Sequence, residues 1–63
     1  MVTVPETVLE IIHESPFLEE GLSRGLINLS SLAREMKSEV EERTMKDVQI
    51  GSIVMALKRI SIK

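Results

Sequence analysis

The stretch that decides the fold is residues 48–60, VQIGSIVMALKRI. Its aliphatic residues recur at the spacing i, i+3, i+4, i+7 and i+10, which places them on one face of a helix. These residues are Ile50, Ile53, Val54, Leu57 and Ile60. Met55 and Ala56 widen the apolar face, so that little of this helix is expected to contact water. We therefore predict a helix over residues 48–60 that the rest of the chain largely covers.

The residues at the two ends of this predicted helix indicate further features of the fold. Gly51 lies near the N-terminal end, and glycine in a helix interior costs about 1 kcal/mol relative to alanine. We expect it to allow another helix to approach closely. Ile60, Ser61 and Ile62 alternate between apolar and polar, which is compatible with a short C-terminal strand.

Capping residues predict two helices in the first part of the chain. Thr3 and Glu6 have the spacing of a capping box, and a proline stands in the first turn between them. Ser15-Pro16 ends this helix, because proline disfavours the helical conformation of the residue before it. The same pair starts the next helix, with Ser15 as its N-cap and Pro16 at its first position. Gly25 is expected to end the second helix in the left-handed conformation.

A third helix follows Asn28, which we predict as its N-cap. Its apolar residues form one stripe. They are Leu29, Leu32, Ala33, Met36 and Val40. Ser38 and Glu41 also have the spacing of a capping box, so this segment is either one helix or two short helices joined at residues 37–38. We favour the break.

Length and composition limit the architecture. The chain has 63 residues, a net charge of -2, one Phe, and no Trp, Tyr or Cys. We expect a single domain over residues 1–63 with an aliphatic core, built as an all-α orthogonal bundle of four or five helices. Cysteine-based disulfides, metal sites and catalysis are excluded. A domain this short is marginally stable alone, so a homodimer or a following domain of a longer parent protein is expected.

No apolar run approaches the roughly 20 residues of a membrane span. The N-terminus also lacks the basic and apolar regions of a signal peptide. We therefore expect a soluble, cytoplasmic protein with no membrane partner.

Few residues suit catalysis or metal binding. His13 alone titrates near neutral pH without help, and beside Glu10 and Glu14 it is expected to be an exposed histidine at a helix end. The serines at 15, 30, 31 and 38 occupy predicted cap positions. The glutamates at 39, 41 and 42 do not converge as metal ligands do, and are expected to face solvent with Lys37 and Arg43 nearby. The sequence thus predicts neither an enzyme, nor a metal site, nor a cofactor.

The charge is distributed unevenly. Residues 1–45 carry 4 basic and 9 acidic side chains, whereas residues 46–63 carry 4 basic and 1 acidic. A basic final helix could contact the phosphates and base edges of DNA. The candidate DNA-binding residues are Lys46, Gln49, Ser52, Lys58, Arg59 and Lys63. Alternatively, the cations at the C-terminal end complement the helix dipole.

Two segments, LSSLAREM at 29–36 and VQIGSIVMALKR at 48–59, together resemble the helical N-terminal module of a group of uncharacterised prokaryotic proteins. In some of these an ACT-like ligand-binding domain follows. Residues 17–30, FLEEGLSRGLINLS, add to the likeness. The resemblance implies a helix-turn-helix or winged-helix-like fold with a transcriptional or metabolic regulatory role. Lys37 stands where the compact motif has a glycine, which favours a winged-helix relative or a three-helix variant.

Two functions remain open. The first is a small regulatory domain of DNA-binding type, transcription-related, with the helix over residues 48–60 facing the duplex. The alternative is a module for protein–protein interaction or dimerisation that binds no nucleic acid, with Met55 and Ile62 at the partner surface. The two are compatible, since many DNA-binding domains act as symmetric dimers.

Overall fold

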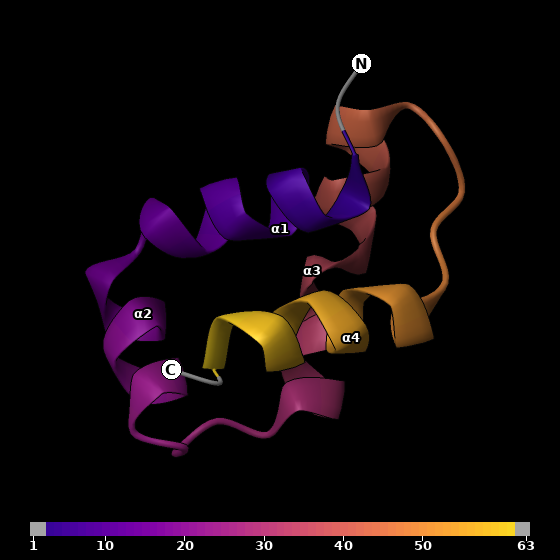
Figure 1. Cartoon of the computed structure of the whole chain (residues 1–63). Helices are drawn as coiled ribbons and strands as arrows, with labels where there is room; N and C mark the ends of the chain where they lie inside the picture. Colours follow the sequence, from indigo (N-terminus) through magenta and orange to yellow (C-terminus); the bar gives the residue numbers. More distant parts are fainter. Residues whose placement is uncertain (1–2, 62–63) are drawn as a thin grey trace.

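The structure is a computed structural model and describes residues 3–61. This range contains four helices: α1 (Val4–His13), α2 (Pro16–Ser23), α3 (Leu29–Thr44) and α4 (Ile50–Ser61). α1 and α4 lie across α3, while α2 closes the side away from the loop between α3 and α4 (Figure 1). The predicted all-α orthogonal bundle is confirmed. No helix within residues 3–61 has both the length and the apolarity to span a bilayer.

Side chains cap three of the helices as predicted. Thr3 Oγ1 accepts the N–H of Glu6 at 3.2 Å, and Glu6 Oε1 accepts the N–H of Thr3 at 3.2 Å, which completes the capping box of α1. Ser15 Oγ accepts the N–H of Leu18, in the first turn of α2, at 3.4 Å. Asn28 Oδ1 accepts the N–H of Ser31, in the first turn of α3, at 3.0 Å. Gly25, with φ +69°, takes the predicted left-handed conformation just after α2.

The core lies where α4 meets the other three helices. Its buried hydrophobic residues are Val8, Ile11, Ile12, Leu22, Ala33, Met36, Val40, Val48, Ile53, Ala56 and Leu57. All are aliphatic, as the composition predicts. Ile53 and Leu57 of α4 are completely buried. The predicted apolar face of this helix is therefore the centre of the bundle.

The predicted break at residues 37–38 is wrong, because α3 continues from Leu29 to Thr44. Ser38 lies exposed on the outside of this helix and caps nothing. Met36 and Val40 are buried one turn apart, which requires an unbroken helix at this point. The i, i+4 ion pair of Lys37 with Glu41 also spans the junction, and that of Glu39 with Arg43 follows directly after it.

The prediction for Gly51 is also wrong. A Cβ atom added there would have nothing within 4 Å, so no helix approaches it. The close approach occurs at Gly21, where an added Cβ would lie 2.6 Å from Ile27 Cδ1. Because Gly21 has no side chain, Ile27, in the segment that leads into α3, can pack closely against α2.

The C-terminal strand is not observed. Ile60 and Ser61 form the end of α4, because Ile60 packs against the core at helical spacing from Leu57. Residues 3–61 contain no strand and hence no wing of the winged-helix type. Ile62 and Lys63 lie outside the described residues. α4 begins at Ile50, two residues after the predicted start.

Candidate functional site

One side of α4 faces away from the bundle. It carries Ser52, Met55, Lys58 and Arg59, which we call the α4 outer face, and all four residues are exposed. Met55 has 58% of its surface exposed, whereas Ala56 beside it has 5%. The prediction that the helix is covered almost all round is therefore wrong for this side. Met55 interrupts an otherwise polar line of side chains.

The outer face adjoins the first turn of α1. Ser52, Met55 and Arg59 line a shallow depression of about 310 Å³ together with Val4, Pro5 and Ala56. Two predicted DNA-binding residues and one predicted partner-surface residue thus share one site. Helical spacing accounts for this grouping, because positions three and seven residues apart lie on the same side.

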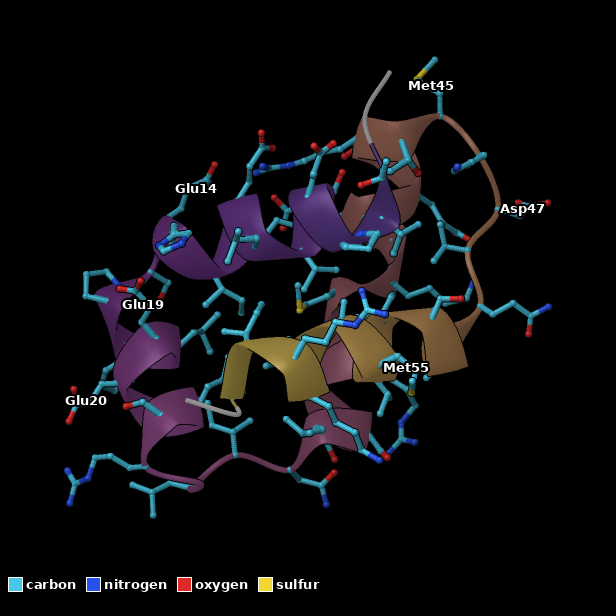
Figure 2. All side chains as sticks on the ribbon, viewed as in Figure 1. Glu14, Glu19, Glu20, Met45, Asp47 and Met55 are labelled. Carbon is cyan, nitrogen blue, oxygen red and sulfur yellow. The ribbon has the colours of Figure 1, made fainter. Side chains whose placement is uncertain are left out.

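The loop between α3 and α4 places the other candidates elsewhere. Lys46 is exposed in a depression that Glu41, Glu42 and Asp47 also line. Met45 and Asp47 project from this loop away from the helices (Figure 2). The carboxylates around Lys46 reduce the positive potential that it offers to a phosphate.

Gln49 immediately precedes α4. Its carbonyl accepts the N–H of Ser52 at 3.0 Å and that of Ile53 at 3.4 Å. The residue lines a third depression with Lys37, Glu41 and Asp47 rather than the outer face. Lys63 and Ile62, the remaining candidates, lie outside the described residues.

Glu41 holds this loop to α3. Its Oε2 accepts from Lys37 Nζ at 2.7 Å and from the N–H of Val48 at 3.0 Å, and its carbonyl accepts the N–H of Met45 at 2.8 Å. Met45 has φ 60°, the left-handed turn that ends α3. The hydrogen bond from Lys37, and next the one from Val48, lowers the pKa of Glu41. Sequence reasoning placed Glu41 near Lys37 but gave no sign of its bond to Val48.

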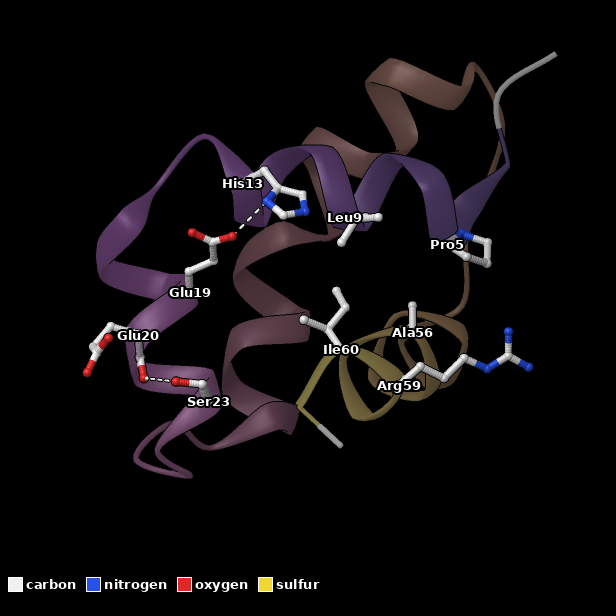
Figure 3. Close-up of a pocket in the computed structure, with 9 residues that line it drawn as sticks. All are labelled: Pro5, Leu9, His13, Glu19, Glu20, Ser23, Ala56, Arg59 and Ile60. Atoms are coloured by element: carbon white, nitrogen blue, oxygen red, sulfur yellow. Dashed lines mark hydrogen bonds and ion pairs between the residues drawn. The ribbon is translucent and has the colours of Figure 1, made fainter. Parts of the chain in front are cut away.

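A larger groove separates α1, α2 and α4. It has a volume of about 560 Å³ and is lined by Pro5, Leu9, His13, Glu19, Glu20, Ser23, Ala56, Arg59 and Ile60. Leu9 and Ile60 point toward each other across its floor, whereas the guanidinium of Arg59 points outward (Figure 3). No sequence pattern predicts this groove, because its walls come from three helices, of which α4 is distant in the chain from α1 and α2.

His13 and Ser23 both line the groove, but they are engaged separately. His13 is exposed at the end of α1, as predicted, and its Nδ1 lies 2.7 Å from Glu19 Oε2 of α2. The Ser23 hydroxyl donates to the carbonyl of Glu20 at 3.0 Å (Figure 3). The first contact joins α1 to α2, and the second lies at the end of α2. Neither holds the serine against a base as nucleophilic catalysis requires.

Arg43 joins α1 to α3. Its Nη1 and Nη2 donate to the two carboxylate oxygens of Glu14 at 3.2 and 3.0 Å, and Nη2 also donates to Glu39 at 2.6 Å. Glu10 lies 3.8 Å from Nη1. The paired guanidinium lowers the pKa of Glu14, and the carboxylates, Glu14 first, raise the pKa of Arg43. The contact between Arg43 and Glu14 links residues 29 positions apart, which no local pattern reveals.

Within residues 3–61, no group of three or more His, Cys, Asp or Glu side chains is arranged to hold a metal ion. Glu39 and Glu41 instead pair with Arg43 and Lys37 on the same helix.

The chain matches no protein-family model, and neither a curated protein nor a solved structure is significantly similar to it.

Proposed function

We propose that this chain is a small DNA-binding domain of helix-turn-helix type in a transcription-regulating protein, with α4 as the helix that enters the major groove. The observation that carries the proposal is the α4 outer face. It presents Ser52, Met55 and Arg59 in one line, with Lys58 beside them in the last turn. Residues 29–36 and 48–59 also resemble the helical N-terminal module of a group of uncharacterised prokaryotic proteins, which agrees with this function.

The dimensions of α4 suit the major groove. The helix has 12 residues, which corresponds to a length of about 18 Å. Ser52 and Arg59 are separated by a rise of about 10 Å, and the major groove is about 12 Å wide. The outer face can therefore span the groove while the buried face remains in the core.

The charge on α4 also supports an orientation in which the α4 outer face lies toward DNA. Residues 50–61 include Lys58 and Arg59 and no acidic residue. Residues 1–45 instead carry 9 acidic and 4 basic side chains. A polyanion would therefore approach the C-terminal half of α4 more readily than the surfaces of the earlier helices.

The test is binding of a pooled set of random DNA duplexes by the whole chain, measured by fluorescence anisotropy over a range of salt concentrations. Replacing Lys58 and Arg59 together by alanine should weaken binding and reduce the slope of log K against log salt by about 2. The matched control replaces Arg24 and Arg34 by alanine. It removes the same charge from other helices and should leave the slope nearly unchanged.

Two results would contradict the proposal. One is the absence of DNA binding by the wild-type chain at low salt. The other is an equal loss of binding in both double variants, since that would indicate an effect of net charge rather than of the α4 outer face.

A protein-interaction module is the second candidate function. The observation that favours it is the exposure of Met55, at 58%, and of Phe17, at 88%, which are large apolar side chains on separate helices. Sedimentation of the wild-type chain tests this function. A concentration-dependent dimer would support it, whereas a strict monomer at high concentration would count against it.

A further inference from the structure

We propose that Met55 contacts the 5-methyl group of a thymine, so that the DNA site of this domain contains a thymine opposite the middle of α4. This inference rests on the proposed function and adds to it the class of base that the helix recognises. It concerns one atom group of the DNA, which makes it testable independently of the phosphate contacts.

The placement of Met55 supports this inference. Ser52 precedes it by three residues and Arg59 follows it by four, so the apolar side chain lies between two groups that can hydrogen-bond to DNA. All three line the depression beside the first turn of α1. In a recognition helix the N-terminal residues contact base edges, and Met55 lies in the N-terminal half of α4. Basic residues toward the C-terminal end are suited to phosphates.

The groups that DNA presents in its major groove favour thymine as the base that Met55 contacts. In the major groove, the C5-methyl of thymine is the apolar group that distinguishes it, and apolar side chains recognise it. Methionine is long, unbranched and flexible, so from a helix in the major groove it can reach this methyl group. Adenine, guanine and cytosine present donors and acceptors in the major groove but no methyl group.

A protein partner explains the exposure of Met55 less well than DNA does. A specific protein interface buries about 800 Å² on each partner and is most apolar at its centre. The α4 outer face has a single large apolar side chain, with two basic residues in its last turn.

The experiment begins with duplexes selected from a random pool by the whole chain. In the tightest-binding duplex, each thymine is replaced singly by deoxyuridine, which lacks only the 5-methyl group. We expect one of these single replacements to weaken wild-type binding about fourfold, the factor for one buried methyl group. Met55→Ala should bind the parent duplex more weakly and be indifferent to that replacement, while Met55→Leu should remain sensitive to it.

Leu26→Ala is the matched control, since Leu26 is also an exposed apolar side chain, at 69%, but lies between α2 and α3. It should behave like the wild type. Because Met55 is exposed, Met55→Ala should keep the helical circular dichroism of the wild type.

The possible results separate the two proposals. If the wild-type chain selects and binds no duplex, both the proposed function and this inference fail. If it binds but no thymine replacement has an effect, or Met55→Ala is as sensitive as the wild type, the inference alone is overturned. A wild-type dimer that Met55→Ala dissociates would also overturn it, because Met55 would then lie in a protein interface.

Discussion

Thr7 is a polar side chain inside an otherwise aliphatic core. It is completely buried, and its Oγ1 has no hydrogen-bond partner among residues 3–61. A buried hydroxyl without a partner destabilises a fold, because it has lost its hydrogen bonds to water. We therefore predict that Thr7→Val, which keeps the shape and removes the hydroxyl, raises the free energy of unfolding by about 1 kcal/mol. For a domain of this size, that corresponds to an increase in Tm of about 4–8 °C.

Thr44 provides the control for this prediction. Its hydroxyl donates to the carbonyl of Val40 at 2.8 Å, so Thr44→Val removes a hydrogen bond and should not raise the Tm. Thermal unfolding followed by circular dichroism measures both variants. An unchanged or lowered Tm for Thr7→Val would mean that its hydroxyl has a partner, such as a buried water.

At the scale of whole elements, Arg43 stabilises the contact between α1 and α3. It donates two hydrogen bonds to Glu14 and one to Glu39. The pKa of Glu14 is lowered below its ordinary value of 4.5, so the folded state favours the ionised carboxylate. The resulting stabilisation is fully present above pH 4.5 and is lost as the pH falls through the lowered folded pKa.

We therefore predict that Arg43→Met lowers the Tm at pH 7, and that its difference from the wild type shrinks on acidification below pH 4.5. Arg24→Met is the control, because Arg24 lies 3.9 Å from Glu20 in an exposed pair on one helix and should have little effect. A difference between the wild type and Arg43→Met that stays constant from pH 7 to pH 3 would contradict the role of the carboxylates.

The loop between α3 and α4 depends on Glu41 for its attachment. Glu41→Ala removes the acceptor of the Val48 N–H, which lies 3.0 Å from its Oε2. We predict that the Val48 amide then exchanges its hydrogen faster, while the amides of central α3 keep their protection. Glu42→Ala, at the exposed neighbouring residue, should leave the exchange of Val48 unchanged. Equal exchange in both variants, measured by NMR, would exclude Glu41 as the residue that holds the loop.

At the scale of the whole molecule, stability depends on the buried side of α4. Leu57 is completely buried there, and replacing a buried leucine by alanine costs about 2–5 kcal/mol. A small domain has a total stability on the order of 5 kcal/mol. We predict that Leu57→Ala is largely unfolded at 37 °C, whereas Met55→Ala, on the opposite side of the helix, melts within a few degrees of the wild type. Circular dichroism distinguishes them, and equal destabilisation would show that Met55 is also buried.

Much of the fold was predictable because it depends on interactions between residues close in the chain. The caps at Thr3, Ser15 and Asn28 join residues three positions apart, and the apolar face of α4 follows from helical spacing alone. Part of the candidate site was predictable for the same reason, since Ser52, Met55 and Arg59 share a side of one helix.

The amino-acid sequence by itself determined where α1, α2 and α3 begin, where α2 ends, and which side of α4 is buried, because the side chains that decide these features are neighbours along the chain. The tertiary structure alone decided that α3 passes unbroken through Ser38, that Gly51 has no neighbouring helix, and that one side of α4 remains exposed. It also brought Arg43 to Glu14 and Glu41 to Val48. These features depend on which surfaces remain to be covered once the helices pack, and local sequence patterns do not specify that.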